Sequence, residues 1–265
     1  MMKTMSLTYK RCAGVYILAT IFCMLTYGGL GAQQTPIRLK YAYTVMDSSY
    51  DAAPPTRVTK IMQRYRPMME NKMLAVVGYA PEALESGRPE SLLSNFAADA
   101  LLHVARWQEG GNIDFALTNF GGLRASIPQG DVRLYDIYAV FPFENALVIL
   151  DMEGVDVWKL FEAFAARGRV EAVSGINISI EDRKIKELLI DGQPFDMQKR
   201  YRVATIDFLL GGGDSVAALK NAADVKYTGL MIRDVVLKYI EGRKAEGKNV
   251  GAEVGGRVRI QEAQQ

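Results

Sequence analysis

The sequence predicts a layered α+β fold in which helices flank a mixed sheet. Its 265 residues are 49% apolar and 23% charged, which suits one globular domain with a sizeable core and excludes a disordered chain. The chain shows no self-similarity at the spacing of about 20–50 residues that marks repeat proteins. Strand-like and helix-like patterns alternate without a strict βαβ rhythm. That order favours an α+β arrangement over a doubly wound sheet.

The first 32 residues are typical of a secretory signal peptide. Lys3, Lys10 and Arg11 precede an apolar stretch over 12–25, which is short for a membrane span, and small residues follow over 28–32. Cleavage would remove both cysteines and three basic residues, so the formal net charge would fall from +2 to −1. We expect a periplasmic or secreted protein without stable membrane insertion. The alternative is an uncleaved membrane anchor.

The chain after this segment divides at about residue 56. Residues 33–55 contain Pro54-Pro55 and are expected to be a linker or extension, whereas residues 56–265 are expected to form the domain. Thr56 is a suitable N-cap for a helix over 56–72, and Pro67 should kink or split that helix. The next patterns predict strands at 74–79 and 113–118 and helices at 92–106 and 134–140.

The second half of the chain continues the mixture of elements. Asp191-Gly192-Gln193 is a turn sequence that suits a hairpin between two strands. The periodicity predicts helices at 156–166 and 230–243 and strands at 146–152, 176–180, 185–190, 201–206 and 258–260.

Composition excludes several kinds of site. One histidine and two cysteines are too few for a His/Cys zinc site, which needs three or four such ligands, and they disfavour a hydrolytic two-metal site. A net charge of +2 gives no electrostatic footprint for nucleic acid. No Gly-x-Ser-x-Gly nucleophile motif occurs. His103 is therefore expected to be structural, and Trp107 and Trp158 to be packing residues on helices.

Three loops that adjoin apolar strands carry candidate binding residues. In the loop 119–124, Gly121 and Gly122 allow a close approach of the backbone to a ligand. Arg124 of this loop can present a planar fork of donors to a phosphate or carboxylate. The alternative is an ordinary Gly-Gly turn followed by a solvated arginine.

The other two loops contribute aromatic and acidic side chains. In 141–145, two phenylalanines flank a proline, which suits either core packing or a platform for a planar base. In 207–215, three glycines follow a strand, but no Lys-Ser/Thr pair follows them, so this is not a Walker A loop. We expect a flexible loop that presents Phe208 and Asp214, and such an Asp can accept hydrogen bonds from ribose hydroxyls.

Together these stretches resemble the C-terminal domain of the 5′-nucleotidase family. The similarity covers about residues 60–262, and its motifs occur in the family's order at 94–100, 119–124, 141–145, 173–175 and 201–214. The resemblance implies that Phe143 and Phe208 sandwich the base of a nucleotide and that Asp214 binds its ribose. It implies that Asn119 and Arg124 face the phosphate, and that Arg88 adds a second phosphate contact.

The chain departs from the family in one respect. The metallophosphatase motifs Asp-x-His and Gly-Asn-His-Glu are absent, and 56–72 resembles the helix that links the family's two domains. We therefore expect the nucleotide- or nucleoside-binding half of a split 5′-nucleotidase. Hydrolysis would need a metallophosphatase chain carrying the divalent metals, and this chain would bind no cofactor. The alternatives are a non-catalytic nucleoside-binding or scavenging protein, and a structural domain whose binding residues have decayed.

Overall fold

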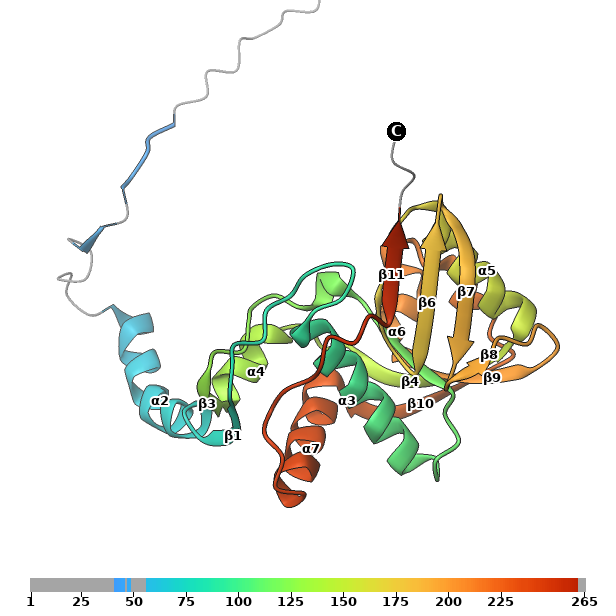
Figure 1. Cartoon of the computed structure of the whole chain (residues 1–265). Helices are drawn as coiled ribbons and strands as arrows, with labels where there is room; N and C mark the ends of the chain where they lie inside the picture. The colour runs from blue at the N-terminus through green and yellow to red at the C-terminus, as the bar shows by residue number, and fades with distance from the viewer. Residues whose placement is uncertain (1–40, 46, 49–55, 262–265) are drawn as a thin grey trace, which may run out of the picture. The chain divides into compact units, whose positions relative to one another are not determined.

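A computed structural model describes residues 41–45, 47–48 and 56–261 of the chain (Figure 1). The expected signal peptide at 1–32 and most of the expected linker at 33–55 lie outside these ranges. The chain from Thr56 onward forms one compact unit. No helix within the described ranges is both long and apolar enough to cross a membrane.

The central element of the compact unit is a five-stranded mixed sheet with the order β10-β4-β9-β2-β5. Only β2 and β9 pair in parallel, and the other neighbours are antiparallel. Strands β2, β4, β5 and β9 are buried along most of their length, whereas the edge strand β10 is largely exposed. Their bounds are β2 Phe115–Thr118, β4 Ala146–Glu153, β5 Ala172–Ser174, β9 Arg200–Ile206 and β10 Asp224–Met231.

Helices cover this sheet, as the sequence predicts. Helix α3 (Leu92–Gln108) packs against β2 and β5 and lies beside α7 (Ile232–Ala245), as Figure 1 shows. The Ser91 hydroxyl caps α3 by accepting the Ser94 N–H at 3.2 Å. Helix α5 (Gly154–Ala166) packs against β4 and β9. The short helix α4 (Leu134–Val140) has the bounds that the sequence predicts.

A second, four-stranded sheet has the order β11-β6-β7-β8. The expected hairpin turn is present between β7 and β8, with positive φ angles of 51° at Asp191 and 74° at Gly192. Strand β11 pairs in parallel with β6, so the C-terminal segment completes this sheet. The bounds are β6 Ile176–Glu181, β7 Lys184–Ile190, β8 Gln193–Pro194 and β11 Val258–Gln261.

The N-terminal part of the compact unit consists of a helix and a small sheet. Helix α2 (Arg57–Met73) is capped at its N-terminus by Thr56, whose side chain accepts the Thr59 N–H. Strands β1 (Val76–Ala80) and β3 (Gly130–Arg133) form a two-stranded antiparallel sheet. The expectation that Pro67 splits this helix is wrong, since α2 continues to Met73. A proline removes one backbone hydrogen bond of the helix, and the turn that follows it closes normally.

Several local expectations differ from the structure. The sequence patterns do not predict β3, β5 or β10. Trp107 is not a packing residue, since its side chain is 72% exposed, whereas Trp158 packs against Phe195 with ring centroids 5.6 Å apart. His103 is exposed on α3, where its ring contacts that of Tyr239 at 5.2 Å. His103 and Trp107 thus lie on an exposed side of α3.

Glu109, which ends α3, is expected to make folding stability depend on pH. Its carboxylate accepts hydrogen bonds from Lys226 at 2.7 Å and from Arg202 at 2.9 Å. These bonds hold the pKa of Glu109 below its usual value, and the bond from Lys226 has the largest effect. Because the pKa of Glu109 is lower in the folded than in the unfolded protein, its ionised carboxylate stabilises the fold at pH values above the unfolded-state pKa of about 4.3. This stabilisation is lost as the pH falls through the folded-state pKa.

Glu109→Gln should therefore destabilise the protein at neutral pH and have progressively less effect as the pH falls below about 4. Urea unfolding of the two proteins across this range measures the difference. A loss of stability that is the same at every pH would contradict the assignment.

Candidate functional site

The three candidate loops meet at one edge of the central sheet. Parallel neighbours place their carboxyl ends together, so the loops after β2 and β9 leave the sheet at the same edge. Strand β4 runs antiparallel to β9, with Leu147 opposite Ile206, so the loop before β4 reaches that edge too. The Ala146 N–H donates to Asp207 Oδ1 at 3.1 Å and joins two of the loops. The topology thus brings together residues that are far apart in sequence.

Asn119 and Asp214 are hydrogen-bonded across two of these loops. Nδ2 of Asn119 donates to Oδ2 of Asp214 at 2.6 Å. Asn119 is only 4% exposed, and its buried Oδ1 has no hydrogen-bond partner in the described chain. The hollow lined in part by Asn119 has a volume of about 10 Å³, near the lower limit for one water. Asn119 therefore fixes one carboxylate oxygen of Asp214 and leaves the other available to a ligand.

The glycines after Asn119 are required by this arrangement. A Cβ at Gly122 would lie 2.7 Å from Asn119 Oδ1. A Cβ at Gly121 would lie 3.3 Å from Asn119 Nδ2 and 3.5 Å from Asp214 Oδ2. The close approach that the Gly-Gly pair allows is thus to the Asn119–Asp214 pair itself.

The backbone of Asp214 is held in an uncommon conformation. Its φ is +51°, in the left-handed region that disfavours residues other than glycine, asparagine and aspartate. Arg167 Nη1 donates to the Asp214 carbonyl at 2.9 Å. A hydrogen bond to the backbone and one to the side chain thus hold Asp214, and they fix the direction of its carboxylate.

Phe208 lies on a turn of helix, not in a flexible loop. Residues Asp207–Leu210 form α6, in which Asp207 Oδ1 accepts the Phe208 N–H at 2.8 Å. Where the sequence predicts a loop over 207–215, the structure has two short helical turns, α6 and the 3₁₀ turn Gly213–Ser215, and the flexibility of the segment stays a prediction. The Phe208 side chain is 43% exposed, and its ring packs so closely over Gly213 that a Cβ there would clash with it. The missing side chain of Gly213 lets the ring lie against the backbone.

Phe143 presents a second accessible ring at the same edge. Its side chain is 47% exposed, and the Arg124 guanidinium lies 6.0 Å from the ring centroid. Within the described residues, the rings of Phe143 and Phe208 form no contact with each other. Each ring is thus about half exposed, and the exposed part is a surface on which a planar group could stack.

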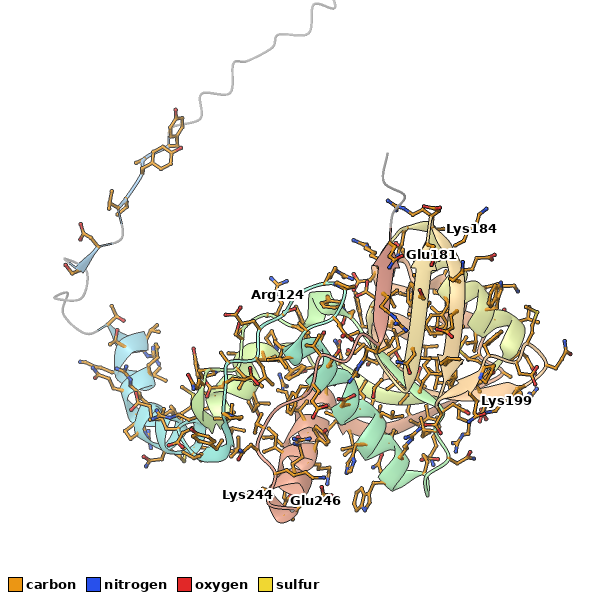
Figure 2. The ribbon with its side chains drawn as sticks, in the orientation of Figure 1. Arg124, Glu181, Lys184, Lys199, Lys244 and Glu246 are labelled. Carbon is orange, nitrogen blue, oxygen red and sulfur yellow. The ribbon has the colours of Figure 1, made fainter. Side chains whose placement is uncertain are left out.

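Arg124 is an exposed cation whose backbone is anchored. Its N–H donates to the Val140 carbonyl at 2.9 Å, which ties the loop after β2 to α4. Figure 2 labels its side chain, which is exposed and forms no hydrogen bond or ion pair in the described part of the chain. The guanidinium therefore has its donors available for an anion.

Arg88 has partners within the protein. Its Nη1 donates to the Val170 carbonyl at 2.7 Å, and its Nη2 lies 3.2 Å from Glu171 Oε2. The guanidinium also stacks over the Phe120 ring, 4.1 Å from the centroid. Arg88 is thus next to the loop after β2, as the resemblance implies, but its donors are partly used by Glu171.

The sequence reasoning missed two residues near this edge, Glu171 and Arg167. Glu171 is 1% exposed and joins Arg88 to Arg167, which in turn holds Asp214. The sequence signal that could have found Glu171 is its position as a single carboxylate within the mostly apolar segment 170–174. A carboxylate that is buried there needs charged or hydrogen-bonded partners.

The described residues of the site supply groups for binding a ligand. Among them, and in the rest of the described chain, no group of three or more His, Cys, Asp or Glu side chains could hold a metal ion. A larger cavity of about 490 Å³ lies elsewhere, between α3, α7 and the segment before β11. Aromatic faces, one carboxylate and guanidinium donors at an open sheet edge suit a ligand with a planar ring, hydroxyls and an anionic group.

Comparison with known proteins agrees with this chemistry. The family model described as "5′-nucleotidase, C-terminal domain" matches residues 76–221, more than half of the chain. The chain belongs to this family. Protein UshA of Yersinia enterocolitica is 27% identical over 220 residues, which cover 79% of this chain and 40% of that protein. Protein UshA of Escherichia coli is 34% identical over 132 residues, which cover 48% of this chain and 24% of that protein.

A solved structure supports the same assignment of fold. The 5′-nucleotidase precursor from Thermus thermophilus aligns with a TM-score of 0.64 at 28% identity, over 80% of this chain and 44% of that one. The layered α+β fold with a mixed sheet flanked by helices, predicted from the sequence, is thus confirmed as that of a 5′-nucleotidase C-terminal domain. The chain spans less than half the length of these relatives.

Proposed function

We propose that this chain is the nucleotide-binding half of a 5′-nucleotidase, which holds a nucleotide for a metallophosphatase that is separately encoded. The observation that carries the proposal is the convergence of Phe143, Phe208, Asp214 and Arg124 at one sheet edge. In keeping with the N-terminal signal pattern, we further propose that the protein acts in the periplasm or outside the cell.

In this proposal each residue contacts a different part of the ligand. The base stacks between Phe143 and Phe208, and such contacts contribute about 1–3 kcal/mol per base. The free carboxylate oxygen of Asp214 accepts hydrogen bonds from the ribose hydroxyls. Arg124 donates to the phosphate, which a planar guanidinium recognises through two parallel hydrogen bonds. Arg88 adds positive charge nearby, reduced by its ion pair with Glu171.

Binding of the base and ribose would serve the reaction by positioning the phosphate. Interaction energy from groups remote from the reacting bond can hold the scissile phosphate in place, and this converts binding into rate. Divalent metals, which activate water and stabilise charge on a phosphoryl group, would be supplied by the partner. The names of relatives such as the trifunctional nucleotide phosphoesterase YfkN of Bacillus subtilis support a role in phosphoester chemistry.

Calorimetric titration of the purified protein with adenosine and with AMP tests the proposal. Both ligands are expected to bind, and Asp214→Asn should weaken both by about tenfold, because it removes a charged hydrogen-bond acceptor while tolerating the left-handed backbone. The protein alone should not hydrolyse AMP with added Mn²⁺ or Zn²⁺.

Other outcomes of the titration and of the hydrolysis assay would change the proposal. Absence of binding to both ligands would overturn the proposed function. Hydrolysis by the protein alone would overturn the need for a partner. Tight adenosine binding without any preference for AMP would favour the non-catalytic nucleoside-binding alternative, since a subunit that presents a phosphate should recognise it.

A further inference from the structure

We propose that Glu171 is a positioning residue for ligand binding, a buried carboxylate that holds both the loop after β2 and the Asp214 loop in their binding geometry. The ligand in this inference rests on the proposed function. The geometry rests only on contacts around Glu171, a residue that does not itself reach the exposed face of the site.

Glu171 lies at the centre of a compact network of donors. Its Oε2 accepts the Phe120 N–H at 3.0 Å and Arg88 Nη2 at 3.2 Å. Its Oε1 accepts Arg167 Nη2 at 3.3 Å and Arg88 Nη2 at 3.3 Å. A carboxylate that is 1% exposed is strongly destabilising unless it is paired and hydrogen-bonded. The three donor groups satisfy this requirement, so their positions depend on the charge of Glu171.

The first consequence concerns Asp214. Arg167 contacts Glu171 through Nη2 and the Asp214 carbonyl through Nη1, so one planar guanidinium joins the buried carboxylate to the strained residue. Burial lowers the pKa of Arg167, and the neighbouring Glu171 acts in the opposite direction. Without the charge of Glu171, the guanidinium would lose its anchor, and the left-handed backbone of Asp214 would lose one of its two restraints.

The second consequence concerns the loop after β2. The Phe120 N–H is bound to Glu171, and the Phe120 ring supports Arg88 by stacking. Residues Phe120–Gly122 form a single turn of 3₁₀ helix, whose glycines pack against the Asn119 side chain. Glu171 therefore restrains both partners of the Asn119–Asp214 hydrogen bond, one from each side.

A double-mutant cycle tests whether Glu171 acts through Asp214. Glu171→Gln keeps the shape of the side chain and removes its charge, and adenosine is used as ligand because it carries no charge of its own. We expect Glu171→Gln to weaken adenosine binding by about tenfold in the wild-type background, but by less than about twofold in Asp214→Asn, because coupled residues have non-additive effects. Equal weakening in both backgrounds, or none in either, would overturn the inference.

Glu109→Gln is the matched control. Glu109 is also a largely buried carboxylate bound by two cations, but it lies at the end of α3 with Arg202 and Lys226. Its replacement should lower stability while leaving adenosine affinity within about twofold of the wild type, because distant sites act independently. If Glu109→Gln weakens binding as much as Glu171→Gln does, the effect is a general loss of stability and the inference is wrong.

Hydrogen exchange without ligand separates this inference from the proposed function. Glu171→Gln should accelerate amide exchange in 119–124 and 211–216 by about tenfold or more, whereas Glu109→Gln should not, because exchange reports local opening. Faster exchange in a protein that binds neither adenosine nor AMP would support the positioning role and reject the proposed function. Unchanged exchange in both segments would overturn the positioning role, whatever the wild-type affinity.

Discussion

Replacing Phe208 by alanine is expected to weaken adenosine binding by roughly 5- to 150-fold, which corresponds to the loss of one stacking contact of about 1–3 kcal/mol. The ring is half-exposed and lies against the backbone at Gly213, so its removal takes away an accessible aromatic face. The fold should tolerate the change, because the buried side chain of α6 is Leu209. Titration calorimetry measures the affinity, and urea unfolding measures the stability.

Tyr227→Ala provides the control for this prediction. Tyr227 is 67% exposed and lies on β10, on the far side of β4 from β9 and β2. Its removal deletes an accessible aromatic ring of similar size without touching the three loops. Adenosine affinity should be unchanged in this variant. Equal affinity in Phe208→Ala and the wild type would show that the base does not stack on Phe208, even if the protein binds nucleosides.

Local sequence patterns predict an element well when its own residues carry the signal. The helix at 134–140 is predicted with its observed bounds, and the Asp191-Gly192 turn is found where its residues require it. Strand β10 escapes prediction for a physical reason. It is an edge strand with polar and aromatic residues on exposed positions, and Gly229, with φ of +74°, interrupts its pairing. Segment 224–231 is a strand because it pairs with β4, and the local sequence of β10 cannot show that pairing.

The candidate site shows a similar division. Phe143, Phe208 and Asp214 could be named from their loops, because glycines and aromatic residues next to strands are visible locally, whereas Asn119 is indicated only by the family resemblance. The ion pair of Arg88 with Glu171 joins residues 83 positions apart, so the sequence indicates for Arg88 only the phosphate contact that the resemblance implies. The roles of these residues toward a ligand stay predictions, and the titrations above test them.

Gly175→Ala is expected to destabilise the protein by roughly 3–5 kcal/mol, among the largest effects for a single methyl group. Gly175 joins β5 to β6 with φ of +77°, which an L-residue adopts at a cost of about 1–2 kcal/mol. The added Cβ would also lie 2.7 Å from the Asp114 carbonyl oxygen and 3.2 Å from Phe115 Cα. Both neighbours are backbone atoms at the start of β2, so relief would require the strand to shift.

Gly192→Ala separates the two contributions to this effect. Gly192 has nearly the same φ, +74°, but a Cβ there meets no atom within 4 Å. Its replacement should therefore cost only the conformational part, about 1–2 kcal/mol, in urea unfolding. Equal losses in the two variants would mean that the backbone near Asp114 yields without cost. A larger loss at Gly175 would mean that contact with β2 fixes this junction, and with it the strand that leads into Asn119.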